Sequence, residues 1–408
     1  KMNNKKYLAY FANSADYDIN HILVGNPLLL NKLCEKFEKV YLIGFQNLVF
    51  FPPKKKENNF KFDKQLKLPK NLELFCPLNW RDFSDFMIDK NLIAIHALAR
   101  GFPELKVHLL LKKYKIKFIQ VSNIGNIQGI YRSLKGSFLK GLWEKVRHDY
   151  SHNLTVLLSN FDLIKKIEIR FVTDSRMLAY RKNNKRFFHK IFNYLNLHFA
   201  KELIVVNSRS FDQIKEQNMT VSEDLIILLD APFNNYQYVA WRGILDKKLL
   251  EKHYYNMRVF LKNLSSIYNK EVVICIHPTE NLEIIKKNYP EFKLLQNQTR
   301  ENVFKAFIVL FHDSSAVIDA ILLKKKIITL TSSLMDQNQI DGIDAYVNRI
   351  GMLKLGIDNK MKINKDDLLL KLEENTENYS NYIKSTIAPD GNNIGYEKII
   401  KIIKERFF

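Results

Sequence analysis

Two histidines in the second half of the chain each follow an apolar run. His277 comes directly after Val-Val-Ile-Cys-Ile, and the ring of Pro278 behind it fixes the backbone and stops the strand. His312 comes directly after Phe-Ile-Val-Leu-Phe and is followed by Ser314 and Ser315, where a helical pattern begins. An imidazole N–H, hydroxyl groups and the unpaired N–H groups of a first helical turn are all donors to phosphate. These residue types in this order predict a phosphate or nucleotide site.

Each of these residues also has a simpler interpretation. A histidine before a proline is compatible with an ordinary strand-end turn, and Ser314 is compatible with a helix N-cap. Capping accounts for a single Ser or Asp, but it does not account for a second histidine at the end of a second strand. The paired occurrence therefore favours a binding site.

The elements that position these residues form a repeating pattern. Apolar runs at Leu225–Leu229, Val272–Ile276, Phe307–Phe311 and Lys326–Leu330 alternate with helical patterns. Apolar strands separated by helices are typical of a parallel sheet covered on both faces, which binds ligands beyond the carboxyl ends of its strands. The residues predicted to share that edge are Asp230, His277, His312, Thr331 and Ser332.

The first half of the chain alternates in the same way, with strands predicted at Tyr7–Phe11, Val40–Phe45, Leu92–His96, Lys117–Val121 and Leu203–Asn207. The predicted fold class is therefore α/β, with two Rossmann-like domains facing a central cleft. We expect an N-terminal domain over 1–215, with a basic, mostly helical insertion over about 131–199. A second domain is expected over 216–395, and a final helix, 396–408, is expected to cross back onto the first domain.

The first domain contains candidate residues for activating and binding the second substrate of a reaction, the acceptor. The triplet Asp16-Tyr17-Asp18 lies in the loop after the first predicted strand, where a carboxylate is suited to act as a general base. A solvated loop acid is the simpler interpretation of either residue. The residues predicted to bind an acceptor are His21, His96, Arg170 and Arg176.

Several classes of protein are disfavoured. The sequence contains no P-loop, and no Gly-x-Gly-x-x-Gly follows a predicted strand, which argues against an ATPase or a dehydrogenase. The three cysteines are far apart, which argues against a disulfide framework and a zinc site and fits a reducing cytoplasm. No secretory signal and no apolar run of about 20 residues is found, so we expect a cytoplasmic protein.

The chain is strongly basic, with 64 Lys and Arg against 43 Asp and Glu and a formal net charge of +21. Such a charge attracts anionic lipid, an acidic glycan or nucleic acid, although a lysine-rich and asparagine-rich composition can also reflect an AT-rich genome. Since no nucleic-acid-binding motif is found, we expect no nucleic-acid partner. Any contact with an anionic membrane is expected to be peripheral, at its inner face.

Two Rossmann-like halves, a strand ending in His277-Pro278, and a strand ending in His312 before Ser314 and Ser315 resemble the GT-B glycosyltransferases of bacterial surface polysaccharide synthesis. The likeness extends over roughly Leu225–Ser333 and is nearest to sialyl-, polysialyl- and Kdo-type transferases. It implies a CMP-sugar donor, a glycan or lipid-linked acceptor in capsule or lipopolysaccharide synthesis, and contacts of His277, Ser314 and Ser315 with the donor phosphate. It also implies that no metal and no cofactor is required.

The chain departs from this family in its first half. The two acids followed by glycine that supply the base in these enzymes are absent, so Asp16 and Asp18 are assigned by position alone. A UDP-sugar transferase, a CDP-glycerol-type polyol-phosphate transferase and a sugar-nucleotide epimerase remain as alternatives. A basic anion-binding scaffold without enzymatic activity is the alternative from another class.

Overall fold

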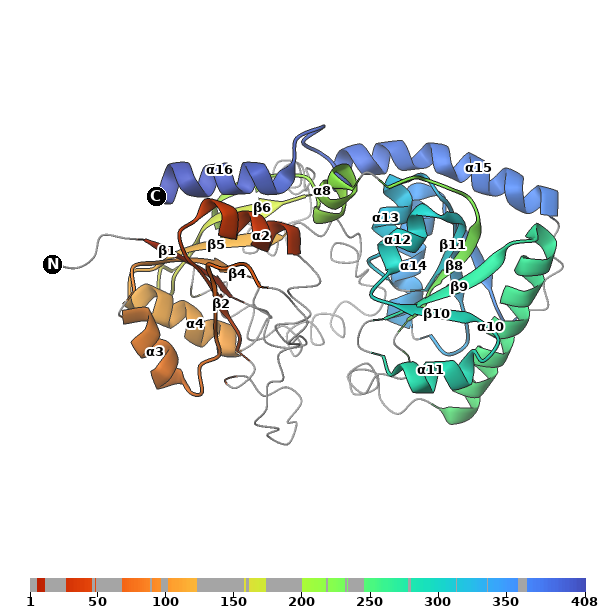
Figure 1. The fold of residues 1–408 in the computed structure, drawn as a ribbon, viewed down its shortest axis with the longest axis horizontal. Coiled ribbons are helices and arrows are strands. Elements are labelled where there is room, and N and C mark those ends of the chain that lie inside the picture. Colours follow the sequence, from red (N-terminus) through yellow and green to blue (C-terminus); the bar gives the residue numbers. More distant parts are fainter. Residues whose placement is uncertain are drawn as a thin grey trace. The chain divides into compact units, whose positions relative to one another are not determined.

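The computed structural model shows two compact units, each built on a parallel sheet (Figure 1). Unit 1 contains the described residues up to Asp212 together with Pro389–Phe408, and unit 2 contains those from Gln213 to Ala388. The structure describes residues 6–11, 27–45, 48, 68–88, 90–96, 102–122, 158, 161–173, 200–217, 219–231, 233, 246–277, 280–312, 314–335, 337–358 and 365–408.

The described strands of unit 1 form a seven-stranded sheet with the order β3-β2-β1-β4-β5-β6-β7. Neighbouring strands are parallel throughout. In chain order the strands are β1 (Tyr7–Phe11), β2 (Val40–Ile43), β3 (Leu72–Phe75), β4 (Leu92–His96), β5 (Lys117–Ser122), β6 (Ile167–Val172) and β7 (Ala200–Val205). Strand β1 lies between β2 and β4 inside the sheet, and its alternating residues are buried on both faces.

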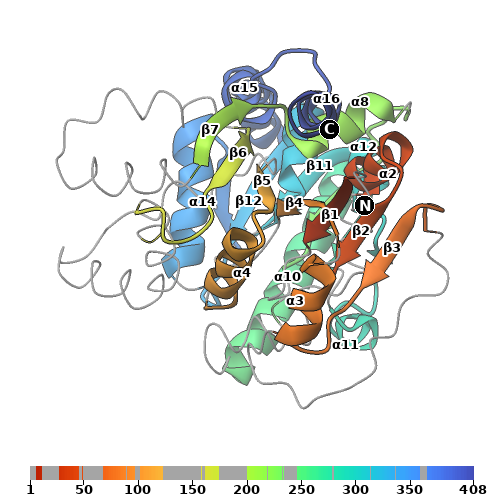
Figure 2. The same ribbon diagram turned by 90° about the vertical axis from the view of Figure 1, so that its left-hand side faces the viewer.

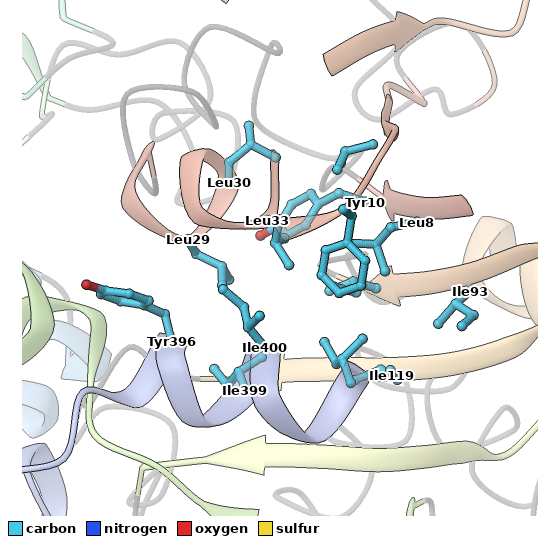
Figure 3. Packing of buried hydrophobic residues seen from close by; sticks show 14 of the residues in the cluster. Leu8, Tyr10, Leu29, Leu30, Leu33, Ile93, Ile119, Tyr396, Ile399 and Ile400 are labelled. Atoms are coloured by element: carbon cyan, nitrogen blue, oxygen red, sulfur yellow. The ribbon is translucent and has the colours of Figure 1, made fainter. Parts of the chain in front are cut away.

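Helices cover both faces of this sheet. Leu8 and Tyr10 of β1 pack in one cluster with α2 (Pro27–Lys36) and α16 (Gly395–Phe407), whereas Ala9 and Phe11 pack in another with α3 (Trp80–Ile88) and α4 (Phe102–Lys113). Figure 3 shows Leu29 of α2 beside Ile400 of α16, and both belong to the cluster that contains Leu8 and Tyr10. Because Ile399 and Ile403 are fully buried, α16 forms an integral part of the core of unit 1.

A set of polar contacts fixes α16 at its N-terminus. The carboxylate of Asp212, in α8 (Arg209–Glu216), accepts hydrogen bonds from the backbone N–H groups of Gly395 (2.7 Å) and Tyr396 (3.0 Å). The fully buried amide of Asn207 donates to the carbonyls of Gly391 and Asn393 and accepts from the Asp390 N–H. These bonds satisfy groups at a helix start that would otherwise be unpaired.

The described strands of unit 2 form a six-stranded parallel sheet with the order β10-β9-β8-β11-β12-β13. The strands are β8 (Leu225–Leu229), β9 (Glu271–Ile276), β10 (Lys293–Gln296), β11 (Ala306–Phe311), β12 (Lys326–Thr331) and β13 (Leu353–Gly356). The helices are α10 (Lys247–Tyr268), α11 (Leu282–Asn288), α12 (Thr299–Phe304), α13 (Val317–Leu322), α14 (Gln337–Ile350) and α15 (Lys365–Tyr382), which continues into the π-helical turn η1 (Ile383–Ile387).

The long helix α10 packs lengthwise on the sheet of unit 2. Asp246 caps its first turn, and Asn269, in the left-handed region with φ of 50°, ends it. Tyr254, Met257 and Leu261 lie on its buried face, as their spacing predicts. His253, in the second turn of α10, contacts His312 after β11 and Ser332 after β12, so this turn lies at the carboxyl edge of the sheet, where the candidate site begins.

The predicted α/β class with two Rossmann-like domains is confirmed, and the structure differs from the sequence analysis in two local details. Within the segment 131–199, expected to be mostly helical, Ile167–Val172 forms β6 between β5 and β7. Its alternation of buried Ile and Phe with Glu168 and Arg170 is short and lies among many basic residues, which hides the period of two. The helical pattern predicted to begin at Ser314 and Ser315 begins instead at Val317, and the helix is six residues long.

Along the part of the chain that the structure describes, no helix combines the length and the apolar character needed to cross a membrane.

Candidate functional site

The order of the strands in unit 2 defines one place at the sheet edge where the topology reverses. From β8 the chain proceeds outward through β9 to β10, and from β11 it proceeds the other way through β12 to β13. In open parallel sheets, ligands bind beyond the carboxyl ends of the strands at such a reversal. His277 follows β9, Asp230 follows β8 and His312 follows β11, while Thr331 ends β12. The polar residues predicted from sequence therefore lie at the carboxyl ends of four neighbouring strands, on both sides of the reversal.

His277 is half-buried and lies at the outer side of this edge. Burial lowers the pKa of its imidazole from 6.5, so the ring is neutral at neutral pH. Its carbonyl accepts from the N–H of Glu280 (3.0 Å) and from the side-chain amide of Gln296, so the turn after β9 is held to β10. A neutral imidazole carries one N–H donor. Pro278 lies outside the described residues.

Ser314 and Ser315 lie in the turn between β11 and α13. Ser314 is half-buried and its hydroxyl accepts from the N–H of Ala316 (3.3 Å), while its carbonyl accepts from the N–H of Val317. Ser315 is exposed. The hydroxyl of Ser314 thus closes the local turn before α13, and Ser315 is the serine whose side chain faces solvent.

His312 is almost completely buried, with 1% of its surface exposed. Its Nδ1 lies 3.2 Å from the carbonyl oxygen of Leu330, and its ring packs against those of Phe233 and His253. Burial lowers the pKa of His312 to about 4, so this imidazole is also neutral. His312 therefore lies in the interior of unit 2, below the solvent-facing residues of this edge.

The residue that contacts His312 from the helix side is His253 of α10, which the sequence analysis did not single out. His253 is 1% exposed, and its Nδ1 lies 2.9 Å from the hydroxyl of Ser332. Burial, followed by the neighbouring His312, holds the pKa of His253 well below its ordinary value. Ser332 is therefore engaged inside unit 2, next to the exposed Ser333.

Asp230 is the third buried member of this edge. Burial raises the pKa of its carboxyl from 3.8 to about 8, and the nearby charge of Glu280 adds to the effect. The Ala231 N–H and the Tyr289 hydroxyl act in the opposite direction, but among the described residues neither carboxyl oxygen has a hydrogen bond of normal geometry. At neutral pH Asp230 is therefore mostly protonated and is able to donate.

The polar residues at this edge fall into two groups by burial, which we call the outer level and the inner layer. The outer level consists of His277, Ser314, Ser315 and Thr331, whose hydroxyl donates to the carbonyl of Leu355. The inner layer consists of Asp230, His253, Tyr289, His312 and Ser332. Across the described residues the inner layer contains five buried polar atoms without a hydrogen-bond partner, namely both Asp230 oxygens, the Tyr289 hydroxyl and Nε2 of the two histidines. Asp230 and Tyr289 are close enough for each to shift the pKa of the other, and His253 and His312 are in ring contact, so the inner layer is a set of interacting buried polar side chains.

Unit 1 has the same kind of reversal, because β1 leads outward to β2 and β3 while β4 leads the other way. Asp16, Asp18 and His21 follow β1 but lie outside the described residues, as does Arg176. His96 is the last residue of β4, and nothing is described of its side chain. Arg170 lies inside β6, opposite Gln120 of β5. No group of three metal-binding side chains is found among the residues that are described.

Comparison with known proteins adds information about the fold. No family model matches the chain, and no curated protein has a significantly similar sequence. Among solved structures, the calicheamicin glycosyltransferase CalG4 aligns over 99% of this chain and 100% of its own, with a TM-score of 0.52 and 10% identity. The wall teichoic acid polymerase TagF, soaked with CDPG, aligns over 98% of this chain and 88% of its own (TM-score 0.51, 11% identity).

A Listeria monocytogenes protein described as a UDP-N-acetylglucosamine 2-epimerase aligns over 98% of this chain and 96% of its own, with a TM-score of 0.50 and 13% identity. The chain has the GT-B fold. At these identities the likeness concerns the fold alone, and GT-B proteins with different reactions are similar to this chain to nearly the same degree.

Proposed function

We propose that the chain is a glycosyltransferase that binds a nucleotide-activated donor at the carboxyl edge of the unit 2 sheet. The observation that carries the proposal is the succession of His277, Asp230, His312 and Thr331 at the ends of β9, β8, β11 and β12. Parallel sheets bind ligands at this edge, and the donors found there suit the oxygens of a phosphate.

The outer level of the edge suits the leaving group. In a displacement at the sugar carbon, negative charge develops on the departing phosphate oxygen, and a fixed donor lowers the barrier by stabilising it. His277 is half-buried and its backbone is held by Gln296, so we assign its N–H to this role. Ser315 is assigned a second contact with the phosphate. The inner layer would hold the outer level in place, with His312 and Ser332 as positioning residues.

For the other half of the reaction we propose that Asp16 or Asp18 deprotonates the acceptor hydroxyl and that His21, His96, Arg170 and Arg176 contribute to acceptor binding. The proposed donor is a CMP-linked sialic acid, Kdo or related ulosonic acid, and no metal is required. The proposed acceptor is a glycan or lipid-linked saccharide of surface polysaccharide synthesis, and a net charge of +21 suits an acidic acceptor.

The donor nucleotide is tested by thermal unfolding of the full chain with CMP, CDP, UDP and GDP. A ligand that binds only the native state stabilises it by about 2.7 kcal/mol at a hundred times its Kd, which is readily measured. We expect the largest rise in Tm with CMP. A rise with UDP or CDP but not CMP would reject the CMP-sugar donor in favour of a UDP-sugar or CDP-glycerol-type transferase. No rise with any nucleotide would contradict the donor site itself and favour a scaffold.

A matched pair of variants locates the site. His277→Ala removes the imidazole that is proposed to donate a hydrogen bond to the phosphate, whereas Lys305→Ala removes an exposed cation at the amino edge of the same sheet. We expect His277→Ala to reduce the nucleotide-dependent rise in Tm and Lys305→Ala to leave it unchanged. Equal rises in both variants would place the nucleotide elsewhere.

A further inference from the structure

Three large apolar side chains are exposed on α4 and on the turn that precedes β6, near the amino edge of the unit 1 sheet. Leu109 in α4 is 47% exposed, and Phe161 and Leu163, in the turn that precedes β6, are 70% and 55% exposed. The turn is joined to α4, since Nδ1 of His108 lies 2.8 Å from the carbonyl oxygen of Lys165 and the Lys165 N–H donates to the His108 carbonyl. Helix α4 and the start of β6 are seen in Figure 2.

This exposure is a property of an ordered surface. Ile164, between Leu163 and Lys165, is 2% exposed and anchors the turn, while Val107 and Leu111 bury the opposite side of α4 in the core. The Leu163 N–H donates to the carbonyl of Leu158. Leu109, Phe161 and Leu163 are therefore presented to solvent by groups that are themselves fixed. Large apolar side chains exposed on neighbouring segments of a surface, rimmed by polar residues, are a feature of interaction sites.

Several lysines lie around the two carboxylates, Asp162 and Glu168, that follow these apolar residues in the turn and in β6. Asp162 forms an ion pair with Lys166 (2.9 Å), and Lys112 and Lys201 are near enough to lower its pKa further, after the larger effect of Lys166. Glu168 is shared by Lys165 (3.1 Å), Lys201 (2.8 Å) and Lys117 (4.0 Å). Five lysines thus share two carboxylates. Two further lysines, Lys113 and Lys115, are exposed at the end of α4 and in the turn before β5.

We propose that this basic–apolar patch, made of Leu109, Phe161 and Leu163 with these lysines, binds the surface of an anionic lipid bilayer. Lysines near such a surface are attracted to the headgroups, and apolar side chains enter the boundary between headgroups and acyl chains. A hydrated polyanion such as nucleic acid or an acidic glycan would pair with the lysines but would leave Phe161 and Leu163 in water. The proposal does not depend on glycosyl transfer.

The patch lies at the opposite edge of the sheet from the loops that follow β1 and β4. Lys117 begins β5 and Glu168 is the second residue of β6, whereas Phe11 and His96 end β1 and β4. A strand of six residues is about 20 Å long, so a membrane bound at the patch is about that far from the carboxyl edge of unit 1. Binding to lipid and occupation of that edge are therefore separable by mutation.

The test is sedimentation of the full chain with vesicles of phosphatidylcholine alone or with 30% phosphatidylglycerol, an amount chosen to give about the surface potential of an anionic membrane. We expect binding only to the anionic vesicles. Phe161→Ser with Leu163→Ser should weaken it about tenfold or more, and Lys113→Gln with Lys115→Asn should weaken it about as much. Asn is chosen because residue 115 is in the left-handed region, with φ of 56°.

Matched controls distinguish the patch from general stickiness. Leu78→Ser with Ile88→Ser removes two apolar side chains, 75% and 59% exposed, elsewhere on unit 1. Lys286→Gln with Lys287→Gln removes two lysines from α11 of unit 2. Both controls should bind vesicles as the unmodified chain does, and all variants should keep its Tm.

Two results would overturn the proposal. One is binding that both patch variants retain. The other is binding that falls with the lysine variant, is unaffected by the Phe161 and Leu163 variant, and is matched by equal binding to heparin, because that pattern describes a polyanion site.

Discussion

The buried carboxyl of Asp230 makes a quantitative prediction about stability. In the folded protein its pKa is raised from 3.8 to about 8, chiefly by burial. Between these two values the native state holds a proton that the unfolded chain has lost, so the free energy of unfolding falls as the pH rises and levels off above about 8. The variant Asp230→Asn keeps the shape of the side chain but does not ionise. It should therefore become progressively more stable than the unmodified protein as the pH increases.

The size of this effect follows from the two pKa values. One pH unit corresponds to about 1.4 kcal/mol for a group that is protonated in one state only. The cost of keeping Asp230 protonated is then about 2 kcal/mol at pH 5, about 4 kcal/mol at pH 7 and about 5 kcal/mol at pH 8, as upper bounds. His253 and His312 also titrate, in the opposite sense at acid pH, but they are present in both proteins and cancel in the difference.

The assay is urea unfolding of both proteins at pH 5, 6, 7 and 8, followed by circular dichroism. Hydrogen exchange of β9 amides assigns the change to unit 2. We expect the difference in unfolding free energy to increase by about 1 kcal/mol or more for each pH unit from 5 to 7. A difference that is constant within about 0.5 kcal/mol across this range would refute the reasoning, because it would mean that Asp230 is ionised in the folded protein.

Two other variants test the anchoring of α16 and the proposed chemistry. In Gly395→Ala, the new Cβ would lie 2.5 Å from the backbone oxygen of Asn207. We therefore expect the free energy of unfolding to fall by about 2–4 kcal/mol and hydrogen exchange in α16 to become faster, whereas the exposed control Lys401→Ala should keep the stability of the unmodified protein. An unchanged Tm in Gly395→Ala would contradict the tight packing. In His277→Ala, we expect kcat to fall about a hundredfold or more with little change in the acceptor KM, relative to Lys305→Ala; an enzyme of full rate would remove His277 from the leaving-group role.

The strands of the candidate site could be predicted because their sequences leave few alternatives. Leu225–Leu229 and Phe307–Phe311 are apolar at every position and end at a polar residue, as central strands of a parallel sheet do. β3 (Leu72–Phe75) is a short edge strand with an exposed Glu73, and its sequence resembles that of many loops. The period of two in the sequence of β6 was not recognised because the strand is short and many basic residues flank it.

The inner layer could not be predicted, because it depends on the order of the strands and on how α10 crosses them. His253 precedes Met257 by one helical turn and belongs to the same apolar face, which is the only sequence signal that it points inward. That its ring meets His312 and Ser332 follows from β11 and β12 lying side by side beneath α10. No local pattern specifies that neighbourhood.

The attachment of α16 to unit 1 has a consequence for the order of folding during synthesis. The core of unit 1 requires Tyr396, Ile399, Ile400 and Ile403, and all four are translated after the whole of unit 2. At the usual elongation rate of about 5–20 residues per second, residues 213–388 leave the ribosome over roughly ten to thirty seconds before α16 is available. Unit 2 can therefore complete its fold first, and until α16 arrives the face of the unit 1 sheet that α16 shares with α2 stays only partly covered. That interval is when a nascent chain of this protein most needs a chaperone.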